Sequence, residues 1–145
     1  LREAESGDPA GRAYKNVIDP LTGARRDFTL PEALAHQPWD VVTIQQVSTG
    51  SFKRETFQPH ADELIQAIRK YAPSAEIVVH MTWAYRDDHE FFQKGDGFTP
   101  AVMHERLREN YLWLAGQYGL RILPSGEAMH LARQTPRWSY VPDPG

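Results

Sequence analysis

The fold is decided by the stretch Trp39-Asp40-Val41-Val42-Thr43-Ile44-Gln45-Gln46-Val47-Ser48, in which an apolar run leads without a break into two amides and a hydroxyl. The residues from Val41 to Ile44 are all β-branched, and their lack of polar alternation is typical of a strand that is buried on both faces. In an open α/β sheet, ligands meet the protein at the carboxyl ends of the strands. This stretch therefore predicts a buried strand whose polar end lies at a functional site.

Helix and strand patterns alternate on both sides of this strand, which we place at residues 39–46. The further elements predicted are a short helix from Thr29 to Ala35, a helix from Phe57 to Ala72, a strand from Glu76 to Met81, a long loop from Thr82 to Gly97, a helix from Pro100 to a glycine stop at Gly119, a strand from Leu120 to Pro124 and a helix from Ser125 to Arg133. Crossovers of this length join parallel strands. The order predicts an α/β fold with a parallel sheet and helices on both faces.

The chain has two parts that differ in pattern. Residues 1–28 mix glycine, proline and scattered charges without periodicity, so we expect an irregular arm or loop there. Residues 29–145 carry the alternating elements and are expected to form the central part of one α/β domain with an incomplete sheet. The missing initial methionine and the turn-rich segment 141–145 indicate a piece of something longer, and disordered flanks around a trimmed domain are the alternative.

Composition excludes several classes of protein. With 145 residues, of which 41% are hydrophobic and 11% aromatic, the chain suits one globular, soluble domain. Its net charge of −3 gives no basic surface for nucleic acid, and no apolar run approaches the ~20 residues of a membrane helix. We therefore expect neither nucleic acid nor a membrane as a partner. The absence of cysteine excludes disulfides and thiolate metal sites but fixes no compartment.

Four blocks of the sequence together resemble the central region of SGNH (GDSL-type) hydrolases, and most of all a poorly characterised bacterial branch that carries the double glutamine. The blocks are residues 39–48, the helix end Lys70-Tyr71-Ala72-Pro73, the strand and loop Ile77-Val78-Val79-His80-Met81-Thr82-Trp83-Ala84-Tyr85, and the segment Gly119-Leu120-Arg121-Ile122-Leu123-Pro124-Ser125-Gly126-Glu127-Ala128. The similarity extends over residues 29–133, and the order and spacing of the blocks make it specific.

The resemblance implies a three-layer α/β/α, flavodoxin-like fold and a serine hydrolase that cleaves esters, often acyl groups on carbohydrates or lipids, without a cofactor. Such enzymes place the nucleophilic serine after the first strand, an oxyanion glycine after the second, an oxyanion asparagine after the third, and an aspartate-histidine pair near the carboxyl terminus. Only the third of these blocks falls inside this chain. The serine is therefore expected before Leu1 and the aspartate-histidine pair after Gly145. The resemblance also favours an exported bacterial protein.

The residue that stands for the oxyanion asparagine is Gln46. Where most such families carry Gly-x-Asn-Asp, this sequence has Val47-Ser48-Thr49-Gly50. A glutamine amide can also place an N–H donor about 3 Å from a developing negative charge, which makes Gln46 the candidate oxyanion donor. Side chains alternate along a strand, so only one of Gln45 and Gln46 faces the site. In the alternative interpretation, both amides satisfy backbone groups at the strand end.

Further candidates for substrate binding follow the predicted strands. They are Gln45, Ser48, Thr49, His80, Trp83 and Tyr85. The aromatic faces of Trp83 and Tyr85 suit a sugar or acyl ligand, although packing beneath the loop explains them equally well, and His80 alternatively forms a hydrogen bond in the core. We expect no metal site, because no H-E-x-x-H motif occurs and the charged loop around His89 is expected to be solvated.

Three functions fit these observations. The first is a serine esterase that acts on an acyl ester, in particular a carbohydrate acetyl group, with its serine outside these residues. The second is a non-catalytic domain that binds a glycan or a partner through Trp83 and Tyr85, and the third is a structural fragment. Catalysis by Ser48, Thr49 or Ser51 is rejected, because no sequence feature places a histidine base beside them. An incomplete sheet has unpaired edges, so the isolated chain is expected to be marginally stable or to self-associate.

Overall fold

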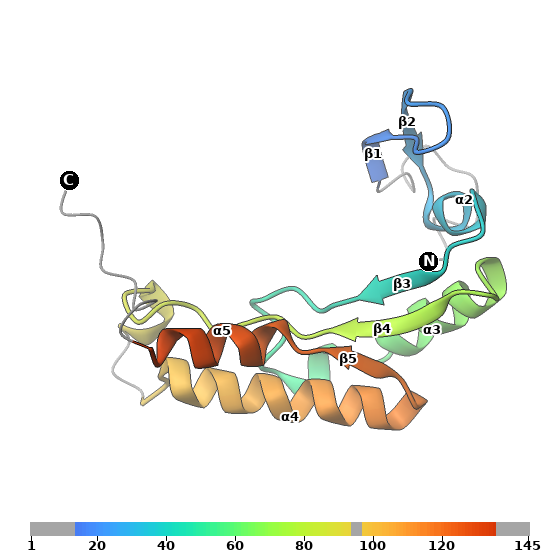
Figure 1. Ribbon diagram of the computed structural model, residues 1–145. Coiled ribbons are helices and arrows are strands. Elements are labelled where there is room, and N and C mark those ends of the chain that lie inside the picture. The colour runs from blue at the N-terminus through green and yellow to red at the C-terminus, as the bar shows by residue number, and fades with distance from the viewer. Residues whose placement is uncertain (1–13, 94–96, 136–145) are drawn as a thin grey trace, which may run out of the picture. The chain divides into compact units, whose positions relative to one another are not determined.

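The computed structural model describes residues 14–93 and 97–135 of the chain (Figure 1). Its elements, in chain order, are β1 (Tyr14–Ile18), β2 (Arg25–Phe28), α2 (Leu30–Ala35), β3 (Val41–Ile44), the 3-10 turn η2 (Arg54–Thr56), α3 (His60–Tyr71), β4 (Glu76–His80), the 3-10 turn η3 (Glu90–Phe92), α4 (Pro100–Tyr118), β5 (Arg121–Leu123) and α5 (Ser125–Arg133). Every helix and strand predicted from residue 29 onward is present, with ends shifted by up to three residues.

Strands β3, β4 and β5 form a three-stranded parallel sheet with β4 in the centre (Figure 1). β4 pairs with β5 in the register Val78 to Arg121, Val79 to Ile122 and His80 to Leu123. The helices α3 and α4 connect these strands in sequence. The chain therefore has a mixed α/β fold consistent with the flavodoxin-like type, and the predicted fold class is confirmed.

The outer strand β3 is more exposed than its sequence predicted. In the central strand, Ile77, Val78 and Val79 are all buried, whereas Val41 of β3 is 46% exposed and Thr43 is also exposed. The prediction of burial on both faces is wrong for β3 in the described part of the chain. The exposed Val41 and Thr43 alternate with the less exposed Val42 and Ile44, so one face of β3 is covered and the other is left largely open.

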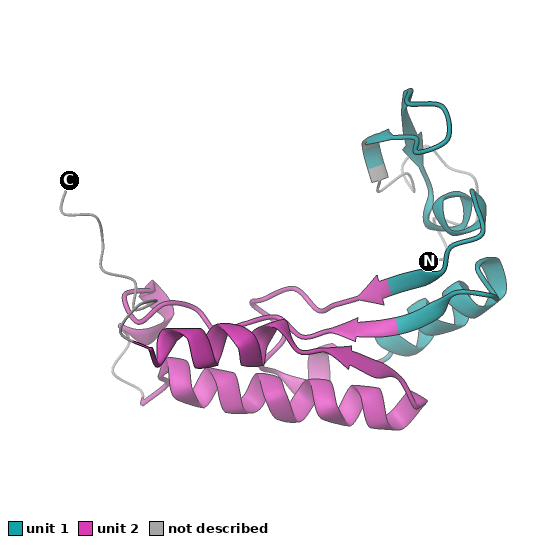
Figure 2. Ribbon diagram, viewed as in Figure 1, with its two compact units in different colours: residues 1–42, 59–77 teal, residues 43–58, 78–145 magenta. Residues whose placement is uncertain are grey.

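The chain divides into two compact units, residues 1–42 with 59–77 and residues 43–58 with 78–145 (Figure 2). In the first unit, β1 and β2 form an antiparallel ribbon, which differs from the irregular arm expected at residues 1–28. The turn of the ribbon depends on Asp19, whose carboxylate accepts the backbone N–H groups of Leu21 at 2.9 Å and Thr22 at 3.3 Å. Gly23 completes the turn at φ 72°, where a side chain would be strained. Residues 1–13 of the expected arm lie outside the described residues.

Asp19 also fixes the ribbon to the end of α2. The side chain is 1% exposed, and its Oδ1 lies 2.9 Å from Nε2 of His36. The hydrogen bond with His36 lowers the pKa of Asp19 to about 2 against the opposing effect of burial, so the carboxylate is charged at neutral pH. The two residues are 17 positions apart, so local sequence patterns do not record this contact.

The helix ends follow the predicted capping residues. Thr29 caps α2 in a capping box, because its Oγ1 accepts the N–H of Glu32 and its own N–H donates to the Glu32 carboxylate at 2.7 Å. Thr99 accepts the N–H of Val102 at the start of α4. The same helix ends at Gly119, whose φ of 64° is the left-handed conformation typical of a glycine stop.

The second unit has its core on α4. Met103, Leu107 and Tyr111 are completely buried, and the ring of Phe57 meets that of Tyr111 edge-on at 5.6 Å. At the start of α5 the N–H of Gly126 donates to the carbonyl oxygen of Met81 at 3.1 Å, which anchors the helix to the chain beyond β4. Within the described residues, no helix is long and apolar enough to cross a bilayer.

Candidate functional site

The loop after β3, residues 46–56, is organised by the carboxamide of Gln46. Its Nε2 donates to the carbonyl oxygen of Thr56 at 2.8 Å and lies 3.2 Å from Thr56 Oγ1, and its Oε1 accepts the backbone N–H of Val47 at 2.8 Å. Because a carbonyl oxygen only accepts and a backbone N–H only donates, the orientation of the amide is fixed. The amide hydrogens that were expected at an oxyanion are therefore used inside the loop.

The hydroxyl of Tyr111 connects the ends of two strands. It lies 3.2 Å from the backbone nitrogen of Gln46, which follows β3, and 3.3 Å from Oγ1 of Thr82, which follows β4. Tyr111 is completely buried and belongs to the apolar side of α4, so its sequence position gave no sign of a polar role. The two loop starts are thus held by one side chain from α4.

A second polar side chain of α4, Asn110, holds the same loop. It is 4% exposed, its Nδ2 donates to the carbonyl oxygen of Ser51 at 3.1 Å, and its Oδ1 accepts Nε of Arg54 at 3.1 Å. Sequence reasoning missed this residue. The signal that could have found it is an amide within the buried stripe between Leu107 and Leu114.

Three of the predicted substrate-binding residues lie in different surroundings. Gln45 is exposed, and Ser48 accepts the hydroxyl of Ser51 at its carbonyl oxygen at 2.9 Å. His80, at the end of β4, has its Nε2 3.0 Å from Oγ of Ser125, the first residue of α5. In the described part of the chain, no carboxylate contacts His80, so this serine-histidine pair has no third group that would orient the imidazole.

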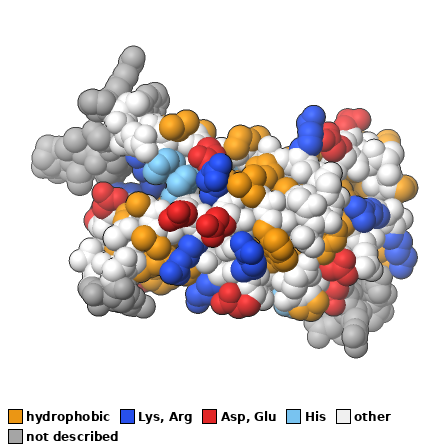
Figure 3. Space-filling view, turned by 90° about the horizontal axis from the view of Figure 1, so that it is seen from below, with side chains coloured by type: hydrophobic (Ala, Val, Ile, Leu, Met, Phe, Trp, Pro, Cys, Tyr) orange, Lys and Arg blue, Asp and Glu red, His pale blue; other side chains and the backbone are white. Residues whose placement is uncertain are grey.

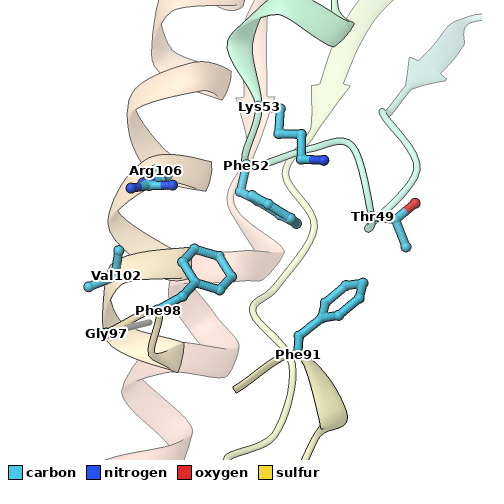
Figure 4. A pocket seen from close by; sticks show the side chains of 8 residues that line it. All are labelled: Thr49, Phe52, Lys53, Phe91, Gly97, Phe98, Val102 and Arg106. Atoms are coloured by element: carbon cyan, nitrogen blue, oxygen red, sulfur yellow. The ribbon is translucent and has the colours of Figure 1, made fainter. Parts of the chain in front are cut away.

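One hollow, which we term the Phe pocket, has a volume of about 470 Å³ (Figure 4). Its walls are formed by Thr49, Phe52, Lys53, Phe91, Gly97, Phe98, Val102 and Arg106. Its three phenylalanines are half-buried and come from three segments, and the ring of Phe52 lies 5.0 Å from that of Phe98 and 6.4 Å from that of Phe91. Of the six residues expected to bind substrate, Thr49 is the one that lies here.

The second hollow, which we term the His pocket, has a volume of about 300 Å³. Its walls are formed by Trp83, Ala84, Asp87, Thr99, Pro100, Ala101, His104, Gly126, His130, Arg133 and Gln134. The rings of His104 and His130 stack in parallel at 3.9 Å, and Trp83 is 44% exposed. Histidine side chains gather beside acidic and basic side chains on the face shown in Figure 3.

Most polar groups of the His pocket have partners within the protein. His104 is 8% exposed and its Nε2 lies 3.5 Å from the carboxylate of Glu127, which also accepts Nε of Arg108 at 2.9 Å. Burial, followed by the nearby His130, lowers the pKa of His104, so its ring is neutral at neutral pH. Nδ1 of His104 is the buried side-chain atom without a hydrogen bond among the described residues.

Tyr85 is half-buried, and aromatic side chains pack against its ring. The ring stacks on that of His89 at 4.1 Å and 8° and lies 5.4 Å from the ring of Phe91 at an angle of 60°. The packing interpretation of Tyr85 therefore fits the geometry better than ligand stacking. Among residues 14–93 and 97–135, no group of three or more histidine or carboxylate side chains is arranged to hold a metal ion.

A parallel sheet with polar loops at the carboxyl ends of its strands places the chain in the class of flavodoxin-like α/β proteins. Within that class, the chain belongs to the family DUF4886, described as a domain of unknown function, whose model matches residues 11–136.

A solved structure similar to this chain is that of a DUF4886 family protein from Bacteroides uniformis. The sequence identity is 28% and the TM-score is 0.65, and the similarity covers 77% of this chain and 45% of the other. The chain therefore spans less than half the length of this relative. No protein of curated function matches the chain.

Proposed function

We propose that this chain is the core of an SGNH-type serine esterase that cleaves acyl esters, and that protein outside these 145 residues supplies the serine and the aspartate-histidine pair. One observation carries the proposal. The Phe pocket is formed largely by the loops that follow β3 and β4, which is where α/β proteins bind their ligands. The blocks that resemble SGNH hydrolases include the starts of both loops.

The proposed activity belongs to the whole protein, because the chain spans less than half of its solved relative. In such a reaction the serine oxygen attacks the ester carbonyl carbon and the histidine takes the serine proton. The alcohol then leaves with that proton, and water releases the acid from the serine. The resemblance to SGNH hydrolases also favours an exported bacterial protein.

In this proposal the chain holds the acyl part of the substrate in the Phe pocket, and Gln46 has a positioning role. Oxyanion donation by Gln46 requires its amide hydrogens to leave Thr56, which already accepts them at 2.8 and 3.2 Å. These two contacts between Gln46 and Thr56 also close the 46–56 loop. That loop carries Thr49, Phe52 and Lys53 into the pocket wall. We therefore assign Gln46 to the support of the pocket.

A second candidate function is that of a non-catalytic binding domain. Two observations favour it: Gln46 has no amide hydrogen left for an oxyanion, and Trp83 offers an exposed ring at the His pocket, where a glycan could stack. The two candidates differ in one respect that an experiment can measure directly, which is the presence of an activated serine.

The deciding experiment treats the full-length protein with a fluorophosphonate, which labels activated serines, and follows intact mass together with hydrolysis of 4-nitrophenyl acetate. Heat-denatured protein is the control for non-specific labelling. A single adduct on a serine outside the 145 residues, with loss of hydrolysis, supports the esterase. A protein that neither reacts nor hydrolyses the ester contradicts the esterase and leaves the binding domain and the structural fragment.

Peptide mapping of the adduct identifies which serine carries the label. Labelling of Ser125, the serine paired with His80, would contradict the proposed location of the nucleophile. The Ser125→Ala variant provides the matched test, because the proposed esterase keeps both its labelling and its hydrolysis in that variant.

A further inference from the structure

The walls of the Phe pocket combine apolar rings with positive charge. Phe52, Phe91 and Phe98 are half-buried and face one hollow from three segments (Figure 4). Apolar side chains left partly open in a hollow of several hundred cubic ångströms are typical of ligand sites, which span roughly 300–1,000 Å³. The volume of about 470 Å³ lies within that range. The pocket is therefore large enough for a small molecule with an apolar body.

Two cations lie at these rings. Nζ of Lys53 is 5.5 Å from the centre of the Phe52 ring, and the guanidinium carbon of Arg106 is 5.4 Å from the centre of the Phe98 ring. In the described part of the chain, neither cation forms an ion pair with a carboxylate. Arg108, two residues along the same helix, does have such a partner in Glu127. Among the described residues, the positive charge of the Phe pocket therefore has no carboxylate partner.

The other polar groups of the pocket are few. Among the described residues of its wall, the hydroxyl of Thr49 is the one uncharged polar side chain, and no carboxylate or amide side chain lines it. A sugar ring needs several side-chain donors and acceptors for its hydroxyl groups, since polar groups left unpaired on burial are costly. The wall instead suits a hydrocarbon chain or aryl ring with an anionic group near Lys53 or Arg106.

We infer that the Phe pocket binds an amphiphilic anion, and that the substrate of the proposed esterase carries an apolar acyl or aryl group longer than acetyl together with a negative charge. The statement about substrate rests on the proposed esterase function, whereas binding of the anion does not. Octanoate is a suitable probe, because it has an eight-carbon chain and one carboxylate.

The test uses the full-length protein and measures dissociation constants by calorimetry for octanoate, octanamide, octylammonium and acetate at low salt. We expect octanoate to bind at least about tenfold more tightly than acetate, which lacks the buried methylenes, and more tightly than octylammonium. In the variants Lys53→Gln and Arg106→Gln, octanoate affinity falls by about two- to fivefold each, as for exposed charge pairs, and octanamide affinity is unchanged.

Two further variants keep the test decisive. Arg108→Gln removes the same charge from the same helix outside the Phe pocket, and its octanoate affinity stays at the wild-type value. Phe52→Leu weakens octanoate and octanamide alike. Equal octanoate affinity in wild type, Lys53→Gln and Arg106→Gln would overturn the charge requirement, and a failure to bind octanoate would overturn the inference as a whole.

Hydrolysis of 4-nitrophenyl acetate and 4-nitrophenyl octanoate distinguishes this inference from the proposed function. Octanoate binding without hydrolysis of either ester refutes the esterase and leaves the anion site in place. Hydrolysis that favours the acetyl ester, without octanoate binding, supports the esterase and refutes the pocket assignment. Preference for the octanoyl ester, lost in Phe52→Leu, supports both.

Discussion

The Phe pocket and the His pocket lie against the same helix but differ in the charged side chains of their walls. Val102 and Arg106 of α4 line the first, and Ala101 and His104 line the second. Positions 104 and 106 are separated by about 200° around a helix, so the two sets of side chains point to different sides. Among the described residues, the wall of the His pocket carries a carboxylate as well as a guanidinium, whereas the wall of the Phe pocket carries two cations and no carboxylate. An excess of positive charge in a pocket wall favours an anionic ligand.

Among variants of the two pockets, Gly126→Ala in the wall of the His pocket is expected to have the largest effect on stability. A Cβ there would clash with the carbonyl oxygen of Thr82 and lie 2.9 Å from Cε of Met81, so the first turn of α5 must move. We expect the free energy of unfolding to fall by about 3 kcal/mol, at the upper end for overpacking, because a backbone atom cannot give way as a side chain can. Chemical denaturation measures this loss.

Gly116→Ala is the matched control for that variant. Gly116 is exposed inside α4, and a Cβ there meets no atom within 4 Å. Alanine is the better helix former, so stability should rise by about 0.5–1 kcal/mol. A Gly126→Ala variant as stable as Gly116→Ala would contradict the close approach of α5 to Thr82.

Gln46→Glu acts on the Phe pocket and should have the next largest effect. A carboxylate cannot donate to the carbonyl oxygen of Thr56, so two acceptors would face each other where a 2.8 Å hydrogen bond now closes the loop. We expect a loss of about 2 kcal/mol in the free energy of unfolding and weaker octanoate binding, since the loop carries Phe52. Gln45→Glu introduces the same charge at an exposed neighbour and should change neither value measurably.

The smallest effect concerns pH and distinguishes the His pocket from the Phe pocket. An unfolded histidine takes up a proton near pH 6.5, whereas burial lowers the pKa of His104 in the folded chain. Between these two pKa values the unfolded state binds more protons, so stability falls as the pH drops below about 6.5. Melting temperatures at pH 7.5 and 5.5 should differ less in His104→Gln than in wild type.

His60→Gln is the control for the pH experiment, because the side chain of His60 is 80% exposed. Its melting temperatures should show the same pH dependence as those of wild type. A wild-type profile that is also found in His104→Gln would assign the pH dependence to other groups.

The sequence predicted those parts of the fold that depend on neighbouring residues. Thr29 and Glu32 form a capping box three residues apart, and Gly119 ends α4, so both helix boundaries could be placed from local signals. The docking of the β1–β2 ribbon on α2 could not, because it depends on the contact of Asp19 with His36. The exposure of one face of β3 depends on what packs against that face, which the sequence of a single strand does not encode.

The candidate site was less predictable for the same reason. The sequence placed Gln46 at the end of a strand and Thr49 shortly after it, and in the structure both lie in the loop that follows β3. It could not show that the amide of Gln46 bonds to Thr56, ten positions later, or that Phe52, Phe91 and Phe98 meet. Such contacts join separate loops, and the spacing of residues along the sequence does not predict them.

The bond between the backbone nitrogen of Gln46 and the hydroxyl of Tyr111 has a consequence for hydrogen exchange. That amide hydrogen is held at 3.2 Å by a side chain 65 positions later, and not by a neighbouring strand. Its replacement by deuterium therefore requires Tyr111 to withdraw, whether or not the strands separate. The exchange rate of this single N–H reports how often the hydrogen bond between α4 and the loop opens. It therefore makes the opening of the Phe pocket wall observable in the unmodified protein.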